Sequence, residues 1–276
     1  ASYYTQETEQ SQITVQNQVS FFGGMQAPPT PTMRIRDFDF NQSIDGFSFE
    51  AYKSAGDYQM IYGLDIQDTE TERPRMLTEM NLITGMATNV VDGETYPNKT
   101  FPDSETKRKA LFFNNRFGLS DSSVLTLGFR YDDYELNTSP DLLLSNANIL
   151  NYQISNTEDS AFTFKLGYLQ DLSENLTGFV QYAEGFKAPD YETSNTVFTN
   201  YLLFYTVTPN PNLGSEESDT IEVGLRGSGE DDSWELAIYR SEVEGFIHPE
   251  AVGFSRGLGI YQYQNAENVE IQGIEF

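Results

Sequence analysis

The chain has 276 residues, of which 42 are acidic and 16 are basic, and its formal net charge is −26. A surface this negative repels phosphate backbones, which argues against nucleic-acid binding. The chain contains no cysteine and one histidine, His248, so disulfide frameworks, thiolate nucleophiles and sulfur-ligated metal sites are excluded. No apolar run approaches the roughly 20 residues of a membrane helix, and the first residues lack the basic and apolar regions of a signal peptide.

Alternation of apolar and polar side chains predicts β-strands along the chain. The clearest alternating segments are 124–132, 162–168, 220–226 and 234–238. About eleven strands are expected, the first at Ser2–Val15 and the last at Val269–Phe276. No segment is a convincing amphipathic helix.

The predicted connections between strands alternate between short and long. Short polar turns are expected at 54–57, 120–123, 171–174, 227–232 and around 265–268. Long irregular stretches are expected at 19–34, 73–107, 133–159, 189–218 and 248–259. This sorting is typical of outer-membrane barrels, which have tight periplasmic turns and long external loops.

The predicted fold is therefore all-β: an antiparallel transmembrane β-barrel with short periplasmic turns and long extracellular loops. An odd number of strands that stops within a strand cannot close a single-chain bacterial barrel, and unpaired edges in lipid are costly. We therefore expect residues 1–276 to be one partial barrel domain, a fragment of a larger barrel. Because barrel lumens are polar, four charged strand residues are expected to face inward: Arg130, Lys165, Glu222 and Arg226.

Three short phrases stand at the ends or starts of predicted strands in the last hundred residues. They are Gly185-Phe186-Lys187-Ala188-Pro189; Asn210-Pro211-Asn212-Leu213 followed by Glu216; and a stretch from Tyr263-Gln264-Asn265-Ala266 to Gly273 and Glu275. A proline at a strand end stops the ladder where a loop must begin, and Asn-Pro initiates turns. The first two phrases therefore predict a structural corner.

These phrases resemble those of the TonB-dependent outer-membrane receptors, in the middle and later part of their β-barrel. The first is similar to the Phe-Arg-Ala-Pro phrase of that family, with Lys187 in place of the usual arginine. Lysine keeps the positive charge but lacks the planar guanidinium group that forms paired hydrogen bonds. The second is similar to the Asn-Pro-Asp-Leu phrase and the glutamate after it. The third is similar to an Asn-x-Gly-x-x-x-x-Gly-x-Glu phrase whose middle glycine is not evident here. The resemblance spans roughly residues 38–276.

The resemblance implies a receptor that binds and imports a scarce nutrient, such as an iron-siderophore, haem or cobalamin, in the outer membrane of a Gram-negative bacterium. Its implied partners are outer-membrane lipid, its own N-terminal plug domain and a TonB-type inner-membrane protein that supplies energy through the plug. We expect the plug and the closing strands to lie outside this chain. The resemblance implies transport rather than an enzyme, and it implies no catalytic residue, cofactor or structural metal.

Four residues are candidates for contact with the nutrient. Haem receptors of the family often carry a histidine in the loop between the first two phrases, but here that loop offers Tyr191, Tyr201 and Tyr205 instead. A phenolate can ligate iron, although loop or girdle aromatics are the simpler interpretation. The fourth candidate is His248, which stands where a strand is expected to leave the membrane and is more simply a capping or girdle residue.

Adjacent carboxylates raise a separate question about calcium, a cation that takes oxygen ligands. The pairs are Asp132-Asp133, Glu216-Glu217 and Asp231-Asp232. None has the spacing of a dedicated calcium loop, so a solvated surface is the simpler interpretation.

Three other functions stay open. A passive porin shares the barrel but lacks the corner phrases. An enzyme built on a barrel needs converging catalytic groups, and one histidine at a strand end is thin support. A soluble acidic β-sandwich would have short strands and unsorted loops, which the sorted connections argue against.

Overall fold

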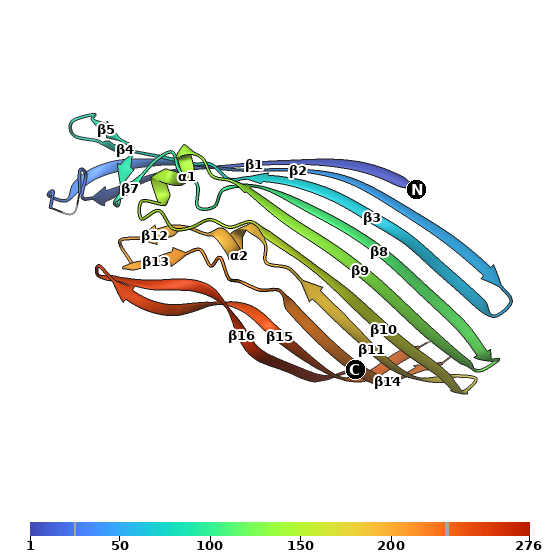
Figure 1. The fold of residues 1–276 in the computed structure, drawn as a ribbon. Helices are drawn as coiled ribbons and strands as arrows, with labels where there is room; N and C mark the ends of the chain where they lie inside the picture. The colour runs from blue at the N-terminus through green and yellow to red at the C-terminus, as the bar shows by residue number, and fades with distance from the viewer. Residues whose placement is uncertain (25, 230–231) are drawn as a thin grey trace.

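The computed structural model describes residues 1–24, 26–229 and 232–276, which form a large open antiparallel sheet (Figure 1). Ten of its strands have 12 residues or more, against the roughly eleven expected. They are β1 (Ser2–Ser20), β2 (Thr30–Ala55), β3 (Tyr58–Glu72), β8 (Asp103–Ser120), β9 (Ser123–Ser139), β10 (Thr157–Ser173), β11 (Leu176–Lys187), β14 (Glu216–Ser228), β15 (Ser233–Ser255) and β16 (Leu258–Glu275). The predicted all-β antiparallel fold is confirmed.

The long strands lie side by side in chain order, each antiparallel to the next, from β1 to β16. A short strand, residues 205–208, pairs in parallel with the outer side of β16. Their lengths, 12 to 26 residues, exceed the five or six of an ordinary globular strand and suit a tilted crossing of a bilayer. Within the described residues, neither short helix has the length or the apolar character that a membrane crossing requires.

The short elements gather at one end of the sheet, on the left in Figure 1. They are β4 (Arg75–Asn81), β5 (Ala87–Thr88), β6 (Val90–Val91), β7 (Glu94–Thr95), α1 (Leu142–Ala147), α2 (Tyr191–Asn195), β12 (Phe198–Asn200) and β13 (Tyr205–Thr208). We call this the long-loop end. At the opposite, short-turn end the strands join through tight turns, of which the predicted turn at 227–232 includes residues 230 and 231, outside the described part. The predicted sorting of the connections is confirmed except between β15 and β16.

Two predicted connections near the C-terminus are wrong. No turn occurs at 265–268, because β16 runs through these residues, and no irregular loop occurs at 248–259, because β15 continues to Ser255. The two strands meet in a hairpin whose turn, Arg256-Gly257, has positive φ at both residues, as a type I′ turn requires. Polar residues suggested loops here because the strands extend well beyond their apolar section.

The pairing register divides the side chains between two faces. One continuous cross-strand row is entirely apolar: Phe49, Leu64, Leu111, Tyr131 and Phe162. Phe129 adds ring contacts on this face, with centroids 5.8 Å from Phe162 and 5.2 Å from Phe164. The register places the four predicted inward residues together on the opposite, polar face. An apolar face toward lipid and a polar face toward a lumen is the arrangement of a membrane barrel.

Buried cores are small and lie at the long-loop end. One consists of Leu77, Val91 and Tyr96, and another of Tyr134, Leu136 and Ala188. The second core is formed partly by the first corner phrase, so it fixes the position of the candidate site.

Candidate functional site

The first corner phrase ends β11 and anchors the loop that follows. Ala188 packs in the core with Tyr134 and Leu136, and Phe186 covers it. The Tyr134 hydroxyl donates a hydrogen bond to the carbonyl of Pro189 at 3.0 Å. Burying each large side chain stabilises such a corner by roughly 1.5–3 kcal/mol, so the chain leaves the sheet in one defined direction.

Helix α2 starts immediately after this corner. The Asp190 carboxylate accepts backbone N–H groups of Glu192 at 3.1 Å and Thr193 at 2.7 Å, and the Thr193 side chain completes a reciprocal cap. Asp is a favoured N-cap because it satisfies donors that the first turn leaves free. Tyr191 packs its ring 4.8 Å from that of Phe101, so the cap also fixes this tyrosine.

Asn210, the first residue of the second phrase, joins α2 to β16. Its backbone N–H donates to the carbonyl of Ser194 at 3.1 Å, and its side-chain amide donates to the carbonyl of Tyr263 at 2.8 Å. Its side-chain oxygen accepts the N–H of Asn212 at 3.0 Å. The predicted turn role of Asn-Pro is therefore combined with a tertiary contact.

Asn265 from the third phrase completes the junction. Its amide donates to the carbonyls of Gly214 at 2.9 Å and Gly245 at 2.6 Å, and its oxygen accepts the N–H of Gly214 at 2.8 Å. Glu216 accepts the N–H of Ile247 at 2.9 Å and pairs with Lys187 at 3.2 Å. Parts of all three phrases thus meet, and we call residues 185–195, 209–216 and Asn265 the corner site.

Gly273 and Glu275 lie outside the corner site, eight and ten positions further along β16. Gly273 faces Tyr239 across the β15–β16 pair, and a Cβ atom there would lie 2.7 Å from the Tyr239 hydroxyl oxygen. Its small size is therefore explained by the Tyr239 ring lying over it. Leu213 is buried at the corner, whereas Pro211 and Asn212 are exposed.

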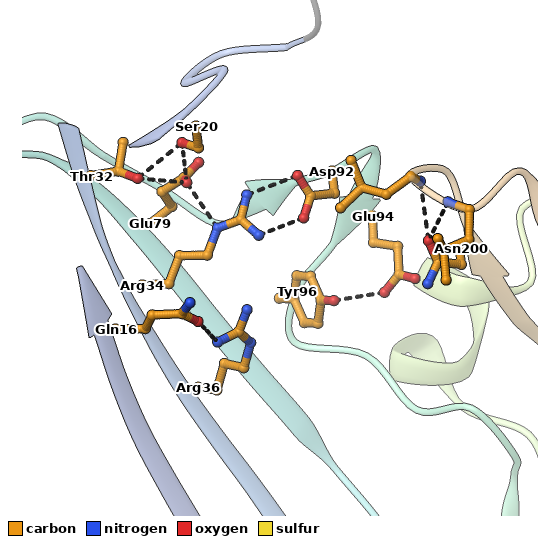
Figure 2. A network of polar contacts seen from close by, with 12 residues as sticks. Gln16, Ser20, Thr32, Arg34, Arg36, Glu79, Asp92, Glu94, Tyr96 and Asn200 are labelled. Atoms are coloured by element: carbon orange, nitrogen blue, oxygen red, sulfur yellow. Dashed lines mark hydrogen bonds and ion pairs between the residues drawn. The ribbon is translucent and has the colours of Figure 1, made fainter. Parts of the chain in front are cut away.

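Three groups of charged side chains hold the neighbouring loops, and the sequence did not suggest any of them. In the first, Arg34 donates to Glu79 at 2.9 Å and to both Asp92 oxygens at 2.6 and 2.8 Å (Figure 2). Glu79 also accepts the hydroxyls of Ser20 and Thr32. Burial raises the pKa of Glu79, but hydrogen bonds from Ser20 and Arg34 outweigh it, so its pKa is lowered.

The second group surrounds Arg75 in the 73–102 loop. Its guanidinium carbon lies 5.6 Å from the ring centres of Phe38 and Tyr96 and 5.5 Å from that of Phe198. It donates to Asn98 at 2.9 Å and to Glu94 at 2.7 Å. The Tyr96 hydroxyl also donates to Glu94, at 2.7 Å, and burial raises the pKa of Tyr96 (Figure 2).

The third group centres on Lys99, which contacts Asp103 at 2.6 Å and Asp141 at 2.9 Å. Asp141 is also the N-cap of α1, where it accepts the N–H of Leu144 at 2.8 Å. Sequence reasoning missed these groups because most partners are distant along the chain. The only local signal was a few basic residues within long loops of an acidic chain.

The four candidate ligand residues do not converge. Tyr191 contacts Phe101, Tyr201 lies over Gly93, and Tyr205 lies 5.9 Å from the ring centres of both Phe198 and Tyr261. His248 pairs with Gln264 within the β15–β16 ladder. Among the described residues, no group of three or more His, Asp or Glu side chains is placed to hold a metal ion.

The adjacent carboxylates point to opposite faces of their strands, as neighbouring strand residues do. Asp132 binds Arg130 at 2.8 Å, while Asp133 lies 3.8 Å from Lys109. Glu216 is held at the corner site. These two pairs therefore cannot chelate one ion together, and the third, Asp231-Asp232, falls partly outside the described residues.

Beside the corner site is a hollow of about 400 Å³. Its lining includes Arg108, Arg130, Asp132, Thr163, Gly185 and Ala188. Arg130 is neutralised by Asp132 and, at 3.4 Å, by Asp65. Arg108 instead lies over the Tyr134 ring, 5.5 Å from its centre, so a guanidinium lines the hollow beside an aromatic face. Such a lining suits polar contacts with a ligand or with another protein segment.

The chain resembles known receptors over its whole length. Residues 1–276 match the family model described as TonB dependent receptor-like, beta-barrel. Haemoglobin-haptoglobin utilization protein B of Neisseria meningitidis serogroup A is 26% identical over 198 residues, covering 63% of this chain and 24% of that protein. The ferrienterobactin receptor of Escherichia coli K12 is 26% identical over 234 residues, covering 75% of this chain and 27% of that protein. The chain thus spans about a quarter of these relatives.

Solved structures show the same fold. The copper transporter OprC superposes with a TM-score of 0.61 at 14% identity, covering 99% of this chain and 39% of that one. The haemophore receptor HasR of Serratia marcescens, in complex with its haemophore HasA and haem, superposes with a TM-score of 0.61 at 13% identity, covering 99% and 46%. Together with the match over all 276 residues, the fold and the corner phrases establish that the chain belongs to the TonB-dependent receptor β-barrel family.

Proposed function

We propose that this chain forms part of an outer-membrane receptor that binds and imports a scarce nutrient, such as an iron-siderophore or haem, with energy from a TonB-type inner-membrane protein. The observation that carries the proposal is the match of the whole chain to a family of receptors. Barrels of this family are outer-membrane proteins of Gram-negative bacteria. In this proposal the long-loop end is external, and the plug and the closing strands are supplied by the rest of the protein.

The relatives support the receptor class but differ in their nutrients. Their names cover haemoglobin-haptoglobin, vitamin B12 and ferric enterobactin. We include haem among the nutrients, free or carried on a protein, because the haemoglobin-haptoglobin protein matches 63% of the chain and HasR is seen with a haem-carrying partner. The dispersed tyrosines and His248 support contact with a ligand at the loop surface rather than one preformed iron site.

The corner site favours a receptor over a passive porin. Side-chain bonds of Asn210, Glu216 and Asn265 connect β11, β15 and β16 to the segment before β14, and the backbone N–H of Asn210 connects α2. A contact on one of these segments can therefore affect several strands. A porin needs only an open lumen. The enzyme alternative has only His248 to rest on, and this residue lies opposite Gln264 in the β15–β16 ladder.

The test uses the complete protein that contains this chain, expressed in a Gram-negative host that lacks its own haem and siderophore receptors. Iron-starved cells are grown on free haem and on a panel of ferric siderophores, with and without a functional TonB. Growth on one source that requires TonB is the expected result. Growth that is independent of TonB indicates a porin, and no growth on any source contradicts the proposal.

A further inference from the structure

A strand from a loop occupies part of the outer edge of β16 (Figure 1). β13 pairs in parallel with residues 259–262 of β16, on the side that faces away from β15, and its other edge pairs with β12. The ten long strands pair antiparallel with one another, as the spanning strands of a membrane barrel do. β13 therefore extends the wall with a segment that is not one of the spanning strands.

Hydrogen bonds fasten this loop to β16 before and after the short pairing, and each of them ends on a backbone carbonyl. The bonded pairs are Gly259 with Phe204 at 2.9 Å, Gln262 with Pro209, and Asn210 with Tyr263 at 2.8 Å. We call residues 204–210, which lie along this edge, the edge clamp. Because bonds both precede and follow the pairing, the register of the edge clamp on β16 is fixed.

The edge clamp is packed like a wall strand. Thr206 and Thr208 are only 4% and 5% exposed. The Thr206 hydroxyl donates a hydrogen bond to the carbonyl of Phe198 at 3.1 Å. On the other face, the ring of Tyr205 meets that of Tyr261 edge-on, with ring centres 5.9 Å apart. Segments that are buried and hydrogen-bonded in this way open less often than exposed loops.

The edge clamp also determines the path of the loop between the first two corner phrases. This loop leaves β11 and returns at β14, yet the clamp lies beyond β15 and β16 in the sheet. β15 has 23 residues and β14 has 13, so the β15–β16 hairpin continues past the start of β14. The loop has to pass this hairpin to reach the far edge of β16, and it is fastened there.

We propose that the edge clamp is a fixed part of the barrel wall that excludes the neighbouring strand of the complete barrel from residues 259–262, so that this strand pairs with β16 only from Gln264 onward. A strand edge takes one partner at a time, because each backbone N–H on it makes one ladder bond. The remaining edge, from Gln264 to Glu275, is as long as β11, which has 12 residues. A strand of this length still crosses the membrane, which requires about 9–11 residues.

A fixed clamp restricts what the loop does in the proposed receptor, and this part of the inference rests on that function. Tyr205, a candidate for contact with the nutrient, belongs to the clamp itself. We expect residues 204–210 to stay bonded to β16 while a nutrient is bound and imported. This part of the loop then serves as a wall and does not swing as a lid.

A cross-link tests the pairing in the complete protein, from which any cysteine outside this chain has been removed. The chain itself has no cysteine. Val207→Cys is combined with Tyr261→Cys, because these residues are partners in the β13–β16 register. The matched control combines Val207→Cys with Ala251→Cys, since Ala251 pairs with Tyr261 from the opposite side of β16. Neighbouring strands lie about 4.8 Å apart, so only the first pair is within reach of a disulfide.

The cross-link is measured in outer-membrane vesicles after mild oxidation. Trypsin cuts after Lys187, Arg226 and Arg256, so the disulfide joins the peptide 188–226 to the one that starts at Gly257. We expect the first pair to be linked at least about tenfold more than the control pair. Equal linking of the two pairs overturns the proposal.

Hydrogen exchange tests the clamp without any substitution. In the complete protein we expect residues 205–208 to exchange at least about a hundredfold more slowly than an unstructured peptide, as residues 264–271 of β16 do. Exchange at 205–208 as fast as in an unstructured peptide overturns the proposal, whatever the cross-linking shows.

Growth of iron-starved cells tests whether the clamp stays closed during import. Free haem and the panel of ferric siderophores are the iron sources, and the two single-cysteine variants are the controls. We expect the cross-linked receptor to support TonB-dependent growth at the level of these controls. Growth that is lost on cross-linking and restored by a reductant shows that the clamp has to open, which contradicts the proposal. If the wild-type protein supports no growth on any source, the receptor function has failed, and cross-linking and exchange still decide the clamp.

Discussion

The guanidinium carbon of Arg75 lies 5.5 Å from the centre of the Phe198 ring, so one buried cation connects the 73–102 loop to the loop between the first two corner phrases. Phe38 of β2 and Tyr96 surround the same cation. The contact joins a strand of the sheet, one long loop and a second long loop through a single side chain. We therefore expect the movements of the two loops to be coupled through Arg75.

Replacing Arg75 tests this coupling. Arg75→Met removes the charge from three rings, the donor to the Asn98 oxygen and the cation paired with Glu94, so we expect a loss of about 3–5 kcal/mol in stability. Hydrogen exchange of residues 198–208, measured on the complete protein, is expected to quicken along with that of residues 94–98. The control is Lys107→Met near the long-loop end of β8, whose part-exposed pair with Glu105 contributes about 0–1 kcal/mol. Faster exchange confined to 94–98 contradicts the coupling.

Asn265 is the second test, because its side chain bonds two backbone carbonyls and one N–H. Asn265→Ala leaves groups of Gly214 and Gly245 without partners, which costs roughly 1–3 kcal/mol. The loss is measured as a lower midpoint of thermal unfolding in detergent. Asn268→Ala, an exposed position in the same strand, serves as the control. Equal midpoints for the two variants rule out a structural role for the Asn265 bonds.

The two faces of the sheet predict opposite effects at neighbouring residues. Val180 lies between Tyr168 and Val223 on the apolar face, whereas Gln181 lies beside Glu222 on the polar face. Val180→Lys is expected to cost about 2–4 kcal/mol when the barrel folds into lipid. Gln181→Lys, with a carboxylate next to it, is expected to cost close to nothing. Urea unfolding of the complete protein in lipid vesicles measures both, and equal costs would show that the faces are assigned incorrectly.

The Lys99 group predicts a pH window for the order of the loop around it. Burial opposes charge on both residues, but hydrogen bonds outweigh it: the pKa of Asp141 is lowered and that of Lys99 is raised. A lowered carboxyl pKa gives stability that is complete above the ordinary value, about 3.9, and is lost as the pH falls through the folded-state value. A raised lysine pKa gives stability that is complete below about 10.4 and is lost as the pH rises through the folded-state value.

Protection factors for hydrogen exchange at residues 97–103 and 144–148 measure this window. We expect them to be highest between roughly pH 5 and pH 9 and to fall outside it. Asp141→Asn is the useful variant, because asparagine still caps α1 while the charge is removed. It is expected to lower protection around Lys99 and keep that of Leu144. An unchanged profile at residues 97–103 contradicts the role of the ion group.

Local alternation was enough to predict the long strands and their faces. Leu125 to Tyr131 and Ile221 to Leu225 alternate because one face meets an apolar environment and the other does not. The corner was also readable, since Pro189 and Asn210-Pro211 limit the backbone locally. The turn at 265–268 was predicted wrongly because the prediction relied on local polarity alone. The polar residues there belong to a section of β16 that lies beyond the apolar part of the strand. In such a section strand and loop residues are equally polar, so polarity does not distinguish them.

The loop networks could not be predicted, because their partners are distant in sequence and no spacing rule links them. Arg34 and Asp92 are 58 positions apart, and Lys99 and Asp141 are 42 apart. Each depends on where several loops come to rest. The dispersal of Tyr191, Tyr201 and Tyr205 has the same origin: closeness within one loop of the sequence did not make them neighbours in space.

The partner exchange along β2 has a mechanical consequence. From Asn41 onward, one edge of β2 pairs with β3. Before that point the same edge pairs with β4, through residues 32–38 of β2. The other edge of β2 pairs with β1. At about 3.3 Å per residue, β4 raises the wall by roughly 20 Å beyond the end of β3. This part of the long-loop end therefore consists of hydrogen-bonded strands. In the proposed receptor, hydrogen-bonded strands hold this part of the long-loop end in place, so loop movements are expected in the irregular segments beside it.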